Sequence, residues 1–113
     1  MPGARMRRVN EAVKEVLSTH IAGDLRDPRV GFVTVTSVET SPDLRSARVY
    51  VSVLGDEDDR AQTLEGLTAS HGFLQSQVAS ELRMKHTPVL EFVYDESIDT
   101  GMRISGLLED ESK

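Results

Sequence analysis

Cysteine and tryptophan are absent from the 113 residues, and aromatic residues of all kinds make up only 4%. Without cysteine the chain has no disulfide, no catalytic thiol and no metal site with cysteine ligands. The three Phe and two Tyr leave the hydrophobic core to aliphatic side chains. So few aromatic rings also argue against a protein that reads single-stranded RNA by stacking its bases.

Long apolar runs are missing as well. No segment approaches the roughly 20 apolar residues of a membrane helix. No apolar stretch follows the N-terminal arginines, as it would in a secretory signal. We therefore expect a cytoplasmic protein without a membrane partner. The length suits a single domain covering residues 1–113, with flexible tails expected at about residues 1–5 and 109–113.

The net charge of −6 is divided unequally along the chain. Residues 1–53 carry eight Lys or Arg and six Asp or Glu, whereas residues 54–113 carry five and thirteen. Nucleic acids are bound by local basic patches and not by the total charge of a protein. The acidic total therefore does not exclude a basic face that binds RNA.

The periodicity of apolar residues predicts helices and strands in a definite order. Helical spacing marks three segments, and β-branched or alternating residues mark three more. The predicted order is helix 6–23, strand 32–39, strand 45–54, helix 59–70, helix 72–84 and strand 89–94. The first two strands are expected to form an antiparallel hairpin. The last strand is apolar on both faces, which predicts a central position in the sheet or burial between layers. A short helix is expected after this strand, within residues 95–113.

This order predicts an α+β fold of two layers, in which helices cover one face of a three-stranded sheet. Ser70-His71-Gly72 separates the two central helices. In KH domains a glycine-rich turn at this place clamps a nucleic-acid backbone, because small residues and free N–H groups let phosphates approach. The Ser70 hydroxyl is expected to cap the second helix, and Gln75 to line the same groove. The alternative is a plain turn between helices.

Basic residues supply further candidates for phosphate contact. They are Arg5, Arg7 and Arg8 at the first helix, Arg45 and Arg48 at the second strand, and Arg83 and Lys85 at the end of the helix after the kink. The alternatives are a solvated tail for the first group and favourable charges at a helix C-terminus for the last. The chain shows no nucleophile or zinc motif, so we expect no enzyme, cofactor or metal. The acidic run at residues 56–59 is interpreted as a helix start.

Several stretches, taken together and in order, resemble the ribosome-binding factor A family from about Met6 to Leu108. They are Asp27-Pro28-Arg29-Val30-Gly31-Phe32-Val33-Thr34, Ser41-Pro42-Asp43-Leu44 leading into Ala47-Arg48-Val49-Tyr50, Gly72-Phe73-Leu74 with Leu82-Arg83-Met84-Lys85, Thr87-Pro88-Val89-Leu90-Glu91-Phe92, Tyr94-Asp95-Glu96-Ser97 and Gly101-Met102-Arg103-Ile104. The resemblance implies a type II KH-like fold whose Gly-Xaa-Xaa-Gly loop is replaced by an Ala-Xaa-Gly kink. Ser70 stands here where the family usually has Ala.

The resemblance also implies a function. The expected protein is a monomeric, non-enzymatic assembly factor that binds 16S rRNA in the immature 30S subunit and assists late maturation and rRNA processing, often in connection with growth in the cold. The RNA-binding residues expected are Arg7, Arg8, Arg45, Arg48, Ser70, His71, Gly72, Gln75, Arg83 and Lys85. Two alternatives stay open: a module that docks another assembly factor, such as an assembly GTPase, and a general KH-like binder of single-stranded RNA.

Overall fold

A computed structural model describes residues 3–97 and contains the predicted elements in the predicted order. The elements are α1 (Ala4–Gly23), β1 (Val33–Thr40), β2 (Ser46–Val53), α2 (Glu57–Ala69), α3 (His71–Glu81) and β3 (Val89–Tyr94). The α+β class and the KH-like order are thereby confirmed. The helix expected within residues 95–113 and the tail expected at 109–113 fall mainly on residues 98–113, outside the described part of the chain.

The sheet is mixed, with strand order β1-β2-β3. β1 and β2 form the expected antiparallel hairpin, and β3 runs parallel to β2 with Tyr94 opposite Val51. β3 is therefore an edge strand, and the central position considered for it was wrong. The hairpin already occupies one side of β2, so the chain returning from α3 pairs with the other side. Val89, the first residue of β3, is 61% exposed.

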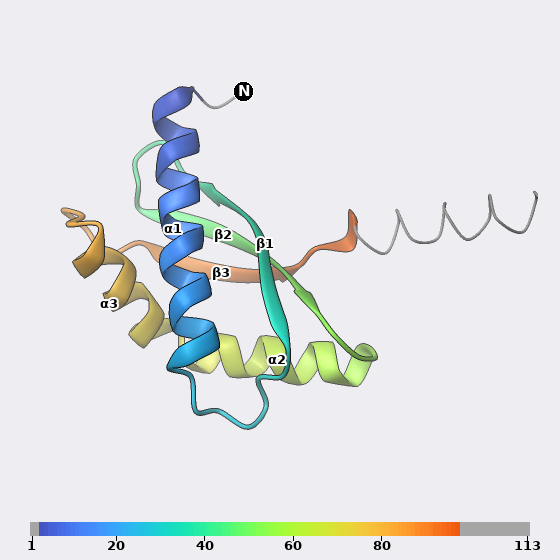
Figure 1. Cartoon of the computed structure of the whole chain (residues 1–113). Helices are drawn as coiled ribbons and strands as arrows, with labels where there is room; N and C mark the ends of the chain where they lie inside the picture. The colour runs from blue at the N-terminus through green and yellow to red at the C-terminus, as the bar shows by residue number, and fades with distance from the viewer. Residues whose placement is uncertain (1–2, 98–113) are drawn as a thin grey trace, which may run out of the picture.

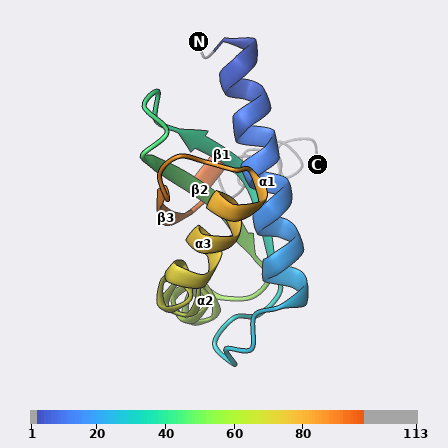
Figure 2. The ribbon, with the colours of Figure 1, turned by 90° about the vertical axis from the view of Figure 1, so that its left-hand side faces the viewer.

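All three helices pack on the same face of the sheet. α1 crosses β1 and β2, α3 lies beside α1, and α2 lies below the C-terminal end of α1 (Figure 1), while the side view in Figure 2 shows α1 and the strands as two layers. The buried side chains that join the layers are aliphatic, as predicted from the composition. They include Val13, Leu17, Val35, Val49, Val51, Leu67, Leu74 and Val78.

Two helix starts differ from the predicted ones by two residues each. α1 begins at Ala4, so Arg5 belongs to the helix and not to the expected tail. α2 begins at Glu57 behind a reciprocal cap. Asp59 N–H donates to the Asp56 carboxylate and Asp56 N–H donates to the Asp59 carboxylate, both at 2.9 Å. This capping box confirms that the acidic run starts a helix, because it satisfies amide groups that the helix itself leaves unpaired.

His20 joins the ends of α1 and α3. Its Nδ1 bonds to Asp24 Oδ2 at 2.5 Å, its Nε2 bonds to the Glu81 carboxylate, and its ring meets Phe73 edge-on with centroids 5.8 Å apart. The hydrogen bond to Glu81, followed by the one to Asp24, raises the pKa of His20 above its usual 6.5. The imidazolium is the form that donates from both nitrogens.

This contact makes the stability of the fold depend on pH. Because the folded pKa is raised, the stabilisation is complete below the unfolded value of 6.5 and is lost as the pH rises through the folded value. The free energy of unfolding of wild type is expected to exceed that of His20→Gln by about 1 kcal/mol near pH 6 and by much less near pH 9. Urea unfolding followed by circular dichroism measures the difference. A difference that stays constant over this range would contradict the prediction, and Glu81→Gln is the control that removes most of it.

Over residues 3–97, no helix has the length and the apolar character that crossing a bilayer requires.

Candidate nucleic-acid interface

Three separate segments bring basic side chains to one end of the molecule. The start of α1 meets the hairpin where Thr40 N–H donates to Asn10 Oδ1 at 2.9 Å. The hairpin turn meets the loop after α3 where Val89 N–H donates to the Arg45 carbonyl, also at 2.9 Å. We call this region the basic end. Its exposed cations are Arg5, Arg7, Arg8, Arg45, Arg83 and Lys85.

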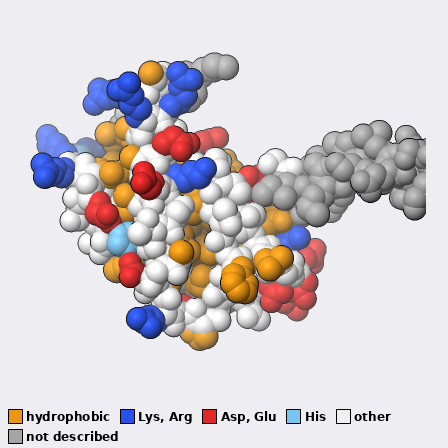
Figure 3. Space-filling model, viewed as in Figure 1, with side chains coloured by type: hydrophobic (Ala, Val, Ile, Leu, Met, Phe, Trp, Pro, Cys, Tyr) orange, Lys and Arg blue, Asp and Glu red, His pale blue; other side chains and the backbone are white. Residues whose placement is uncertain are grey.

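The views agree on this grouping. The start of α1, the hairpin turn and the loop between α3 and β3 share the upper part of the molecule in Figures 1 and 2. Lys and Arg side chains gather over the start of α1 and over the loop after α3 in the space-filling view (Figure 3). The clustered positive charge is what phosphate binding requires.

The loop that carries Arg83 begins earlier than predicted, because α3 ends at Glu81 and not at residue 84. Arg83 N–H bonds to the Ser80 carbonyl and Met84 N–H bonds to the Ala79 carbonyl, at 3.3 and 2.9 Å. This is the Schellman pattern of helix termination, in which the residue after the cap is left-handed. Arg83 takes that position, with φ 51°.

Glycine usually occupies this position, since other residues are strained there. The sequence shows no glycine near residue 83, which is why the end of the helix was not predicted. Arg83 and Lys85 are therefore exposed on a turn and do not lie on a helix. His86 follows in the same exposed loop. It was not among the predicted residues, although its place next to Lys85 was a usable signal.

The kink residues lie at the other end of α3. Ser70 separates α2 from α3, and α3 begins at His71, so the predicted break is confirmed. Eleven residues of helix then separate the kink from the basic end, about 16 Å at 1.5 Å per residue. The RNA-binding residues predicted from the sequence thus form two groups and not one continuous site.

One expectation about the kink was wrong. Ser70 makes no side-chain hydrogen bond to cap α3. Gln75 is half-buried, and its Oε1 accepts a hydrogen bond from Leu90 N–H at 3.0 Å, which fixes the start of β3. His71 is exposed, and its Nδ1 bonds to the Thr68 carbonyl at 2.6 Å. A Cβ atom on Gly72 would meet nothing within 4 Å, so this surface is open to approach.

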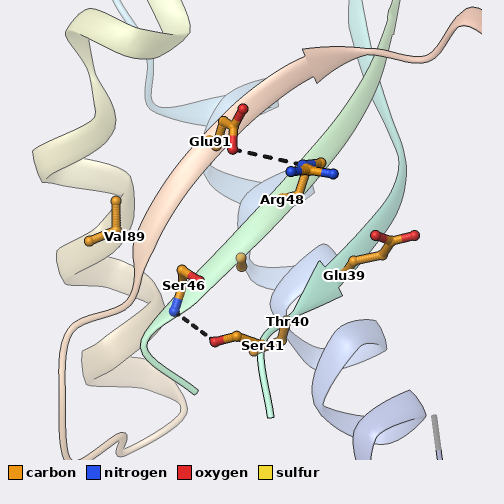
Figure 4. Close-up of a pocket in the computed structure, with 8 residues that line it drawn as sticks. Glu39, Thr40, Ser41, Ser46, Arg48, Val89 and Glu91 are labelled. Carbon is orange, nitrogen blue, oxygen red and sulfur yellow. Dashed lines mark hydrogen bonds and ion pairs between the residues drawn. The ribbon is translucent and has the colours of Figure 1, made fainter. Parts of the chain in front are cut away.

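Arg48 differs from the cations of the basic end in its neighbours. It lies opposite Glu39 of β1 and Glu91 of β3 in the sheet register, and its Nε is 3.7 Å from Glu91 Oε2. Figure 4 shows these side chains around a shallow pocket of about 330 Å³ at the end of the hairpin. Two carboxylates around one guanidinium make a poor site for a phosphate. The structure therefore gives Arg48 a cross-strand role within the sheet.

Within the described part of the chain, no group of His, Asp and Glu side chains is placed to hold a metal ion.

Comparisons with known proteins agree with the fold and the motifs. The family model described as ribosome-binding factor A matches residues 5–108. The crystal structure of ribosome-binding factor A from Thermus thermophilus has a TM-score of 0.70 and 29% identity, covering 79% of this chain and 94% of that one. A solution NMR structure of a candidate ribosome-binding factor A from Thermotoga maritima has a TM-score of 0.73 and 36% identity, covering 82% and 89%.

A third structure describes a relative in a complex. It is a homology model of the Thermus thermophilus ribosome-binding factor A, fitted into an electron cryo-microscopy map of that protein with the 30S subunit. Its TM-score is 0.63 and its identity 30%, covering 77% of this chain and 91% of that one. The family model covers nearly the whole sequence, and the similar structures share its fold. The chain belongs to the ribosome-binding factor A family.

Proposed function

We propose that this protein binds 16S rRNA in the immature 30S subunit through its basic end and assists late maturation and rRNA processing. The main observation behind the proposal is that cations from three segments lie together at one end of the fold. Hydrogen bonds that involve backbone N–H groups join the three segments that carry these cations. A relative that is fitted into a map of its 30S complex supports the same partner.

The mechanism is one of binding and not of catalysis. Exposed Arg and Lys side chains neutralise phosphates and release counterions, which provides affinity without reading base sequence. Folded rRNA presents phosphates at fixed positions, so a rigid set of cations selects an RNA shape. The protein would hold such a shape in the cytoplasm until the particle matures, a requirement that is expected to be greatest during growth in the cold.

Cosedimentation with purified 30S subunits, 50S subunits and 70S ribosomes tests the proposal. Binding is expected to 30S subunits alone. If six cations each meet a phosphate, affinity should fall about a thousandfold between about 50 and about 200 mM salt. A folded protein that does not pellet with 30S subunits at low salt would refute this function.

The same experiment separates the alternatives. Docking on another assembly factor such as a GTPase, through apolar contacts, predicts little dependence on salt. A general single-strand binder predicts comparable affinity for short RNA oligonucleotides without any particle. We expect weak binding to such oligonucleotides, because the described residues present few exposed aromatic rings for stacking.

A further inference from the structure

Two large apolar side chains are exposed side by side at the end of the β1–β2 hairpin that lies opposite Arg45. Phe32 is 81% exposed and Leu54 is 75% exposed, the highest values among the large hydrophobic residues of the described chain. Leu54 N–H donates to the Phe32 carbonyl at 3.0 Å, so the two residues face each other across the strands. Side chains in such cross-strand pairs are about 5 Å apart.

This pair is not part of the core. Val53, next to Leu54, is buried, and Val33, next to Phe32, packs against the core. Single exposed apolar residues are common, whereas contiguous exposed apolar patches are typical of surfaces that bind a partner. The Phe32–Leu54 pair therefore has the character of a docking surface, and the charges around it indicate what docks there.

The surrounding charge is negative. Leu54 is followed by Gly55 and then by the capping box at the start of α2. Asp56 and Asp59 are used in that cap, whereas Glu57 and Asp58 are exposed and form no ion pair with the described residues. Figure 3 shows exposed hydrophobic side chains beside a group of acidic ones at the end of the molecule where α2 begins.

The negative charge beside the Phe32–Leu54 pair indicates which kind of molecule can bind there. RNA would be repelled by the carboxylates, and a second copy of this chain would bring two acidic turns together. A positively charged protein segment meets both features, since its cations pair with the carboxylates and an apolar side chain covers the exposed pair. Proteins that contact rRNA phosphates carry such Lys and Arg residues.

We propose that Phe32 and Leu54, rimmed by the acidic start of α2, dock a Lys- and Arg-rich protein segment that carries a large apolar side chain. The inference rests on the proposed function, because it takes this segment to belong to a protein of the 30S particle. The molecule then has two poles: the basic end binds rRNA, and the Phe32–Leu54 surface binds a protein of the same particle.

Site-specific photocrosslinking tests the docking surface. Phe32 is replaced by p-benzoylphenylalanine, the protein is bound to purified 30S subunits, and the products of irradiation are identified by mass spectrometry. Val89 carries the same group in the matched control, because it is exposed but lies beside Arg45 at the basic end. We expect position 32, and not position 89, to crosslink to a Lys- and Arg-rich peptide of a 30S protein.

Several outcomes would overturn the proposal. Crosslinks from position 32 to rRNA, to a second copy or to residues 98–113 of this chain would each identify a different occupant. The absence of any crosslink, in protein that pellets with 30S subunits, would overturn the docking surface alone. Failure of wild type itself to pellet would instead refute the proposed function, and with it the 30S protein as occupant.

Affinity gives a second readout that does not depend on crosslinking. The variant Phe32→Ser with Leu54→Ser should bind 30S subunits about tenfold more weakly, with an unchanged salt dependence. Ala22→Ser is the control, because Ala22 is exposed in the last turn of α1 and belongs to neither surface, so this variant should bind as wild type does. Equal affinities of the double variant and wild type would contradict the proposal, provided that circular dichroism shows both to be folded.

Discussion

Reversing the charges of Arg83 and Lys85 is expected to weaken binding to the 30S subunit by about a hundredfold at low salt. Both side chains are exposed on the loop after α3, at the basic end. Each reversal removes an attraction to phosphate and adds a repulsion. The variant Arg83→Glu with Lys85→Glu should also show a shallower salt dependence, because fewer counterions are released. Cosedimentation at a series of salt concentrations measures both quantities.

The matched control for this variant is Arg26→Glu. Arg26 is exposed in the loop between α1 and β1, away from the basic end, and its reversal changes the net charge in the same direction. It should have little effect on binding. If Arg26→Glu weakened binding as much, per charge, as the double variant, total charge and not the basic end would be responsible.

Arg83→Gly separates the role of this residue in folding from its role in binding. Arg83 has φ 51°, in the region that favours glycine. Glycine should therefore keep the stability of the fold or raise it by up to about 1 kcal/mol. The same substitution should lower 30S affinity, because it removes a cation. Loss of stability in urea unfolding would contradict this account of the end of α3.

Leu17→Ala is expected to lower the free energy of unfolding by about 2 to 5 kcal/mol. Leu17 is fully buried in the core between α1 and the sheet. Removing its side chain leaves a cavity that the packed neighbours fill only in part. For a domain of ordinary stability, about 5 to 15 kcal/mol, this is a large fraction of the total. Urea unfolding followed by circular dichroism measures the loss.

Leu17→Met is the control for this core substitution. It conserves most of the volume, so its cost should stay below about 1.5 kcal/mol. Leu17→Ala should lower 30S affinity in proportion to the fraction unfolded. Equal unfolding midpoints for Leu17→Ala and wild type would show that α1 contributes little to the core.

Local patterns in the sequence were sufficient to locate most of the elements. The last strand was predicted over residues 89–94, and β3 has these bounds. The hairpin, the first helix and the break near Ser70 were also predicted, because apolar periodicity and turn residues act over a few neighbouring positions. The end of α3 was not predicted, because Arg83 takes the left-handed position at which glycine usually marks the end of a helix.

The candidate site was predicted less well than the fold. Charge and residue type were enough to predict that the basic residues are exposed. They could not show which of these residues lie together. Arg48 was grouped with Arg45, yet its neighbours across the sheet are Glu39 and Glu91. Gln75 was assigned to a groove, yet it bonds to the backbone of β3. Both outcomes depend on strands and helices that are distant in sequence.

The sequence by itself determined the α+β class, the order of elements, the aliphatic core and the resemblance to the family. These properties follow from periodicity, composition and motifs, which are local. Only the tertiary structure decided that β3 lies at the sheet edge, that Arg7, Arg45 and Arg83 share one end, and that Ser70 lies at the other end of α3. The physical reason is that strand pairing and helix packing join residues far apart in the chain, and no local pattern specifies those partners.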